Sequence, residues 1–385
     1  MTKTEKDLIY LISCGINKVT PSFHRAGEFD ISAILESGTK HRIVVAAAMA
    51  LSELDREQRF LSEADSSRIS YIINRNKVKV TLFDTEIEQQ FHALDEMGIF
   101  YVPVKGLAIW DIYPEYAMRE MSDYDILYDK SKRSELIRFM VSRGYDHYFN
   151  VGIEDAFHKK PFYNFEYHIS LIPKKPYLQN IYDYFSDFDK RLIKDPAAKM
   201  KYRLSDLDQY IYITSHSWKH YSGRGCGLKA LTDDYLFRKH RGAGFSEHEA
   251  DAVFEKFGIL SFAKLIRRLS DKLFSDPESV YDVRLEEDEN EMLSYILDSG
   301  ISGTRKNFVK NTLRQLQGDD SKIKTSTKLR FVFSRLFPPL DEMRRESRLV
   351  KASPLFLPIG YVVRLISAIF KKDSISEELD LLKKS

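Results

Sequence analysis

The chain has 385 residues, which exceeds the size at which a single hydrophobic core keeps growing, so we expect two or three domains. Its hydrophobic content of 43% and charged content of 30% are ordinary for a globular protein, and a net charge of +2 excludes a strong overall field toward nucleic acid or acidic membranes. Two cysteines, Cys14 and Cys226, exclude a disulfide framework and a cysteine-built zinc site, and they fit a reducing compartment.

From the sequence we expect neither an export signal nor a transmembrane segment. The apolar run 8–12 is too short for an export signal, and no uninterrupted stretch approaches the ~20 residues of a spanning helix. The nearest candidate, residues 354–370, is interrupted by Pro358, Gly360 and Arg364. We therefore expect a cytoplasmic protein in which 354–370 packs against the N-terminal helices. Peripheral contact of this segment with a membrane is the alternative.

Residues 1–97 are expected to form an N-terminal helical region. The run 43–51 is apolar and rich in alanine, which is typical of a buried helix. Further along, apolar residues recur at intervals of three and four and would lie on one helix face: Ile87, Phe91, Leu94 and Met97. Gly98 follows, where a glycine commonly ends a helix.

Residues 98–178 predict a small unit of alternating strands and helices. Short β-branched and aromatic stretches predict three strands, at 99–104, 123–128 and 162–171. Between the strands we expect a helix at 107–112 and a second one that begins at Ser131 or Ser134 and ends before Gly144.

Helical patterning returns after residue 178 and continues to the end of the chain. We expect a helical domain at 179–316, which would close over the cleft of the preceding unit, and a C-terminal helical extension at 317–385. The boundary falls at 317–321, where glycine and short polar residues cluster. The segment 322–351 that follows is basic, with nine Lys or Arg residues against three acids.

Three acidic residues form the candidate catalytic group. Asp123 and Asp125 are separated by one residue in a predicted strand, so both side chains would point to the same face, and Glu166 lies in another strand. Carboxylates so close repel each other unless a cation neutralises them, and Mg²⁺ binds such oxygen ligands together with phosphates. The three acids would hold two metal ions and catalyse phosphoryl or nucleotidyl transfer. The alternative is that all three are ordinary surface residues.

Other residues near these acids would take part in the same chemistry. Lys105 and Gly106 lie where a strand passes into a helix, and there the backbone and the lysine would bind phosphate, unless this is an ordinary turn. Arg119 would bind a triphosphate or brace the aspartates; an ion pair that organises the loop is the alternative. His168 shares a face with Glu166, and we expect it to orient a metal ligand, with direct ligation or an ordinary buried histidine as alternatives.

A succession of short motifs resembles a known family. They are Val-Pro-Val-Lys-Gly at 102–106, Tyr-Pro at 113–114, Arg-Glu-Met-Ser-Asp-Tyr-Asp-Ile-Leu at 119–127, Gly-Tyr at 144–145 and Phe-Glu-Tyr-His at 165–168. With them, the chain resembles the uncharacterised nucleotidyltransferase family of the polymerase-β-like superfamily. The resemblance extends to segments at 216–220, 227–233 and 299–304 and covers most of residues 1–340.

The resemblance implies an α+β fold, in which a small mixed-sheet nucleotidyltransferase core is flanked by N-terminal and C-terminal helical regions. It implies two Mg²⁺ ions at Asp123, Asp125 and Glu166. It also implies nucleotide contacts from the following residues: Lys105, Gly106, Arg119, His220, Lys229 and Asp233. One departure is that Leu107 follows Gly106 where many superfamily members have serine or glycine, so no hydroxyl is available there for a phosphate.

The predicted function is a Mg²⁺-dependent nucleotidyltransferase that moves an NMP group from an NTP such as ATP to an acceptor hydroxyl and releases pyrophosphate. The acceptor stays open between a small molecule, a protein side chain and an RNA end. Two alternatives belong to other classes of protein. One is a catalytically inactive descendant that binds or assembles. The other is an RNA-binding helical protein, which would rest on the basic segment 322–351 alone.

Overall fold

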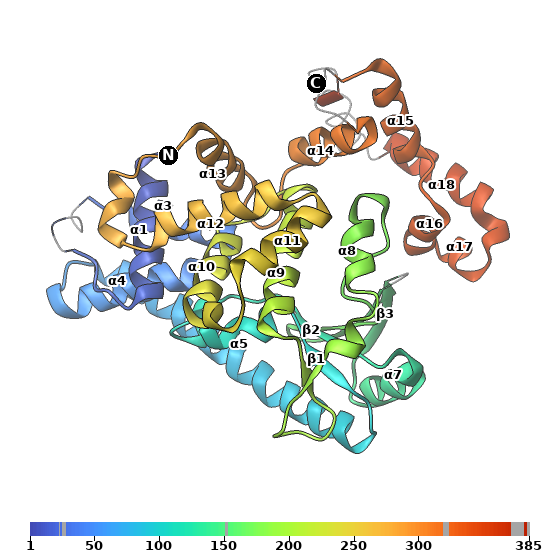
Figure 1. The fold of residues 1–385 in the computed structure, drawn as a ribbon, viewed down its shortest axis with the longest axis horizontal. Helices are drawn as coiled ribbons and strands as arrows, with labels where there is room; N and C mark the ends of the chain where they lie inside the picture. The colour runs from blue at the N-terminus through green and yellow to red at the C-terminus, as the bar shows by residue number, and fades with distance from the viewer. Residues whose placement is uncertain (23, 25–27, 151–152, 319–322, 371–380, 383–385) are drawn as a thin grey trace.

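The structure is a computed structural model that describes all residues except 23, 25–27, 151–152, 319–322, 371–380 and 383–385. A group of N-terminal helices is followed by a mixed sheet and then by further helices (Figure 1). This order confirms the predicted α+β class. The division into four domains and the identity of the sheet as a nucleotidyltransferase core stay predictions.

The N-terminal helical region forms as predicted. Its helices are α1 (Lys3–Asn17), α3 (Ile31–His41), α4 (Val44–Gln58) and α5 (Glu63–Glu96). The apolar run 43–51 lies almost entirely in α4 and is buried. The predicted stripe of α5 faces the sheet, with Ile87 and Leu94 buried and its other two members partly buried beside them. Gly98 has a φ of 66° and directly follows the end of this helix.

The central sheet contains five strands in the order β1-β2-β5-β4-β3. They are β1 (Tyr101–Pro103), β2 (Tyr124–Tyr128), β3 (Asp146–Asn150), β4 (Glu154–Lys159) and β5 (Tyr163–His168). β2 and β5 are parallel, and every other neighbouring pair is antiparallel. The three predicted strands are present but shorter than expected, and Asp123 lies just before β2 rather than in it.

The hairpin of β3 and β4 was not predicted. Its residues mix charged, aromatic and small side chains, so neither face is uniformly apolar and the two-residue period is weak. Buried Asp155 explains part of this pattern, because a charge occupies a core position. Arg133 donates two hydrogen bonds to its carboxylate, at 2.9 and 2.7 Å, and the Tyr128 hydroxyl donates a third at 3.0 Å.

The helices of the central unit also differ from the prediction. The helix expected at 107–112 is α6 (Gly106–Ile109), a single turn that passes into a 3₁₀ turn at 110–112. The second helix, α7 (Arg133–Ser142), has no serine cap. Instead, the carboxylate of Asp129 accepts a hydrogen bond of 2.9 Å from the backbone N–H of Ser131 and caps the 3₁₀ turn that precedes α7.

The part of the chain after residue 178 is mostly helical, as predicted. Its helices are α8 (Gln179–Tyr184), α9 (Asp206–Tyr221), α10 (Lys229–Arg241), α11 (Glu247–Phe257), α12 (Leu260–Phe274), α13 (Glu287–Ser299), α14 (Arg305–Gln317), α15 (Thr325–Leu336), α16 (Leu340–Glu346), α17 (Arg348–Ala352) and α18 (Leu357–Phe370). An unpredicted pair of short strands, β6 (Ile193–Lys194) and β7 (Tyr202–Arg203), interrupts them. Of the predicted linker, residues 319–321 lie outside the described residues.

The prediction that 354–370 packs against the N-terminal helices is wrong. α18 packs against α15, α16 and α17, and this C-terminal group lies on the opposite side of the molecule from α1 (Figure 1). The chain reaches this position because α14 and α15 lead away from the N-terminal helices. Among the described residues, no helix is long and apolar enough to cross a membrane.

The sheet lies between two hydrophobic cores. Val102 and Leu127 point to a core that joins the N-terminal helices to α9–α13. Tyr101, Ile126 and Tyr128 point to a second core, formed with α5 and α7. This alternation follows from the two-residue period of strands. The face that carries Leu127 therefore also turns Asp125 toward the helices α9 and α10.

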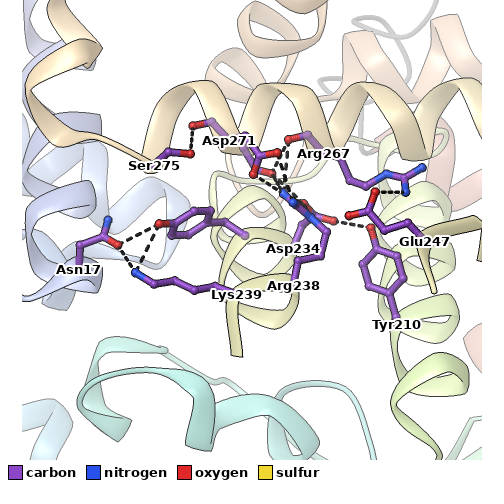
Figure 2. A network of polar contacts seen from close by, with 11 residues as sticks. Asn17, Tyr210, Asp234, Arg238, Lys239, Glu247, Arg267, Asp271 and Ser275 are labelled. Atoms are coloured by element: carbon purple, nitrogen blue, oxygen red, sulfur yellow. Dashed lines mark hydrogen bonds and ion pairs between the residues drawn. The ribbon is translucent and has the colours of Figure 1, made fainter. Parts of the chain in front are cut away.

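A buried polar network ties α10 to its neighbours (Figure 2). The carboxylate of Asp234 accepts hydrogen bonds from the Tyr210 hydroxyl at 3.0 Å, the Arg238 guanidinium at 3.0 Å and the Ser270 hydroxyl at 2.7 Å. Arg238 also forms an ion pair with Asp271 at 2.6 Å. The network connects α9, α10 and α12 and so fixes the helices that face the sheet.

We expect the substitution Asp234→Ala to lower the free energy of unfolding by about 3 kcal/mol, since a buried guanidinium and two hydroxyls each lose this acceptor. The matched control is Asp271→Ala. That carboxylate is 47% exposed, and its loss should cost less than about 1 kcal/mol. Urea denaturation of both variants measures the difference, and equal losses would contradict the role assigned to Asp234.

Candidate active site

The pairing of β2 with β5 brings the acidic residues together. In this parallel pair Asp125 lies beside Glu166, and Leu127 lies beside His168. Tyr124 points the other way and stacks on Phe83 of α5, with 4.3 Å between ring centroids. The predicted alternation is therefore present, and the catalytic candidates of both strands share the face that α9 and α10 cover.

Asp125, Glu166 and His168 form a compact group that could hold a metal ion. One ligand atom from each lies within 4.8 Å of the other two. His168 Nε2 lies 2.7 Å from Asp125 Oδ1 and 3.7 Å from Glu166 Oε2. Lys105 Nζ lies 2.5 Å from Asp125 Oδ1 and 4.0 Å from Glu166 Oε2. The two carboxylates thus attract the ammonium of Lys105, as the ligands of a metal ion attract the ion.

Asp123 stands slightly apart from this group. It is half-buried, and its Oδ1 accepts a hydrogen bond of 3.1 Å from the Ser122 hydroxyl. It lines the same cavity as Asp125 and Glu166. The compact group in the structure therefore contains His168 in the place that the sequence prediction gave to Asp123.

Burial and charge act in opposite directions on the two strand carboxylates. Burial would raise the pKa of Asp125, but the adjacent Lys105 and His168 hold it well below its ordinary value. The pKa of Glu166 rises to about 8, first because the carboxyl is buried and then because Asp125 lies beside it. Without a bound cation, the pair therefore carries close to one negative charge at neutral pH.

Lys105 is held in this position by an unusual backbone. Its φ of 50° lies in the left-handed region, which a residue with a side chain adopts at some cost in energy. The next residue must be glycine, because a Cβ on Gly106 would lie 2.1 Å from Nη1 of Arg119. α6 has a single turn, so its N-terminus lacks the dipole of a long helix.

Arg119 and Asp233 bind each other. Nε and Nη2 of the arginine donate to the two carboxylate oxygens at 2.9 and 2.8 Å, and the Tyr113 hydroxyl donates to the same carboxylate at 2.7 Å. Of the roles considered for Arg119, the structure shows the organising ion pair. It fastens the segment before β2 to α10 and thereby fixes the position of Lys229, four residues before Asp233.

Basic residues of α9 and α10 lie across from the acids. His216 and His220 are one turn apart, with 2.9 Å between their Nε2 atoms. The Lys229 ammonium donates to the backbone carbonyl of Glu120 at 3.1 Å. The pKa of Lys219 is lowered to about 8, mainly by burial and then by the nearby cation Lys105. The pKa of Lys229 is also lowered to about 8, mainly by burial and then by Arg119.

These groups line one cavity of about 390 Å³, a size typical of small-molecule sites. All the predicted site residues contribute to its lining except His168, which lies buried behind Asp125. The acids of β2 and β5 lie on one side, and the lysines and histidines of α9 and α10 lie on the other. The cavity can therefore accommodate a ligand that carries both phosphate and metal.

Three acidic or basic residues of the lining were not among the predicted site residues: Glu154, His216 and Lys219. Glu154 belongs to the unpredicted strand β4, and its Oε2 lies 3.4 Å from Nδ1 of His168. His216 and Lys219 stand in the same short motif as His220, at helical spacings of three and four, so one face of a helix was the available signal.

Comparison with known proteins agrees with the motifs. A family model described as "Uncharacterised nucleotidyltransferase" matches residues 27–275, more than half of the chain. The match ends before the predicted turn at 299–304. No curated protein and no solved structure matches the chain. The motifs, the cavity and the family match agree, and the chain belongs to the uncharacterised nucleotidyltransferase family.

Proposed function

We propose that the protein is a Mg²⁺-dependent nucleotidyltransferase that transfers an NMP group from an NTP to an acceptor hydroxyl. The observation that carries this proposal is the single cavity with carboxylates on one side and lysines on the other. A metal-bound triphosphate has the complementary charges, since its cation faces acids and its phosphates face bases.

Asp123, Asp125 and Glu166 would hold the metal ions. The donor set fits Mg²⁺, because it supplies carboxylate oxygens beside an open cavity and already attracts the ammonium of Lys105. When bound, Mg²⁺ supplies neutralisation of phosphate charge and a more acidic acceptor hydroxyl. His168 would hold Asp125 in place through Nε2, with Glu154 fixing the other side of the ring.

Lys105, Lys219, Lys229 and His220 would contact the triphosphate. The two α9 and α10 lysines have pKa values of about 8, so an arriving phosphate would favour their charged forms. In the reaction, the acceptor oxygen bonds to the α-phosphorus, the bond from that phosphorus to pyrophosphate breaks, and the hydroxyl proton is lost. The lysines would stabilise the charge that develops on the departing pyrophosphate.

Removal of either aspartate should abolish transfer. With α-³²P-labelled NTPs and a cell extract as the source of acceptor, we expect Asp123→Asn and Asp125→Asn each to reduce labelling by at least about 100-fold, because the metal ions lose a ligand. Asp298→Asn, at an exposed position of α13, is the matched control and should retain full activity.

Circular dichroism and thermal melts of the same variants check that the fold is intact. Undiminished labelling by both folded variants would refute the enzymatic proposal. Binding of Mg-NTP without pyrophosphate release, over all four NTPs and a broad panel of acceptors, would instead favour an inactive binding protein.

Metal binding should be linked to the loss of a proton from Glu166. Because the pKa of this carboxyl is raised to about 8, it is largely protonated below that pH, and a metal ion must displace the proton. The affinity for Mg²⁺ should therefore rise with pH up to about 8, by at most about tenfold per unit, and then level off. Calorimetry at pH 7 in two buffers of different ionisation enthalpy measures the released proton.

In Glu166→Gln no such proton is available, so the buffer dependence should disappear. Glu135→Gln, at a partly exposed position of α7 outside the cavity, should behave as the unchanged protein. A buffer dependence that persists in Glu166→Gln would show that another group releases the proton.

A further inference from the structure

Helix α18 exposes an apolar face. Its exposed large side chains recur at intervals of three and four, which places them on one side of the helix. They are Ile359, Val362, Val363 and Ile366, each about half exposed at 49–54%. Leu355 and Phe356, in the turn that leads into the helix, are exposed by 87% and 39%. Contiguous exposed apolar residues of this kind mark an interaction surface.

Two polar side chains of α18, those of Tyr361 and Arg364, point inward instead. The Tyr361 hydroxyl donates to the backbone carbonyl of Pro338 at 2.9 Å. The Arg364 guanidinium donates to the carbonyl of Arg335 at 3.1 Å. Gly360 is buried, and a Cβ there would lie 2.5 Å from Cγ2 of Val350. The helix thus packs through its glycine and polar residues and leaves its apolar side uncovered by the described residues, the reverse of an ordinary surface helix.

Helix α15, which packs against α18, also exposes apolar side chains. Leu329 and Phe333 are each 65% exposed, and Phe337 follows at 37%. The ring of Phe337 lies 5.4 Å from that of Tyr361, so the two helices meet at these aromatic residues. Figure 1 shows both helices at the outer edge of the molecule, away from α1. These exposed side chains therefore lie away from the main hydrophobic core.

Positive charge is concentrated in the same segment. Residues 322–372 contain 12 Lys or Arg and three Asp or Glu, a net charge of 12 − 3 = +9, whereas the whole chain has +2. No acidic residue occurs between 347 and 372. The rest of the chain is accordingly negative, by 2 − 9 = −7. A strongly basic segment that exposes apolar side chains complements a surface that is anionic outside and apolar beneath.

We infer that the exposed face of α18 binds the surface of an anionic phospholipid bilayer. The apolar side chains would enter the acyl boundary, and the net positive charge of residues 322–372 would attract the segment to the phosphate headgroups. α18 has 14 residues, which at about 1.5 Å per residue is shorter than the ~30 Å hydrocarbon core, so it would lie along the surface. A second copy of the chain is a poorer occupant, because two +9 segments repel each other. This inference is independent of the proposed catalytic activity.

The test is flotation of the full chain with phosphatidylcholine vesicles, with and without phosphatidylglycerol. We expect binding only to the anionic vesicles, and weaker binding at high salt. The double variant Val362→Asp with Val363→Asp should lower the partition coefficient at least about tenfold, since two charges replace apolar side chains that enter the bilayer. Both valines are exposed, so the fold should tolerate the change.

The matched control is Val78→Asp, a valine of α5 that is 58% exposed, and it should bind vesicles as the unchanged protein does. Equal binding to neutral and anionic vesicles, or undiminished binding by the double variant, would overturn the inference. A protein that binds no vesicles would also overturn the inference. This holds for a monomer and equally for a dimer that the double variant dissociates in gel filtration.

Discussion

The parallel pairing of β2 with β5 is the constraint on which the site depends. Its register places Asp125 beside Glu166 in a partly buried position, where two negative charges cannot stand together unneutralised. Glu166 is largely protonated, and Lys105 neutralises Asp125; the placement of this lysine involves a left-handed backbone after the end of β1. The residue after Lys105 is glycine because the guanidinium of Arg119 occupies the space where a Cβ would lie. The same guanidinium binds Asp233 of α10. The pairing of β2 with β5 is thereby linked, through Lys105, Gly106 and Arg119, to the attachment of α10.

Sequence could predict the parts of this arrangement that depend on local spacing. The alternation around Asp125, the position of Glu166 in a second strand and the apolar stripe of α5 all follow from periods of two or of three to four residues. The pairing of Arg119 with Asp233 could not be predicted, because it joins residues 114 positions apart. Glu154 was missed for another reason. The strand that carries it places a charged residue, Asp155, in the core, and so it lacks the apolar alternation by which strands are recognised.

The C-terminal segment shows a different limit of sequence reasoning. Apolar residues recur at helical spacings in 354–370, which indicates that one helix face is apolar but not which surface that face contacts. The expectation of packing against the N-terminal helices assumed that an apolar face turns inward. In the structure the inward positions are taken by Gly360, Tyr361 and Arg364, whose contacts are a close backbone approach and two hydrogen bonds to carbonyls. Tyr361 and Arg364 thus find their hydrogen-bond partners within the C-terminal segment, and the apolar side chains of α18 stay exposed.

The cavity is lined by acids of β2 and β5 and by lysines of α9 and α10, and both groups would affect how the proposed ligands bind. A metal ion alone would neutralise the acids of β2 and β5 but would leave the partly buried Lys219 and Lys229 near an added positive charge. A nucleotide alone would bring its phosphates to the lysines but also close to Asp123 and Asp125. Bound together, each ligand removes the repulsion that the other meets, so their free energies of binding are coupled. The proposed site would therefore favour the metal–nucleotide complex over either component, and the ion pair of Arg119 with Asp233 would help to keep α10 in place beside the acids.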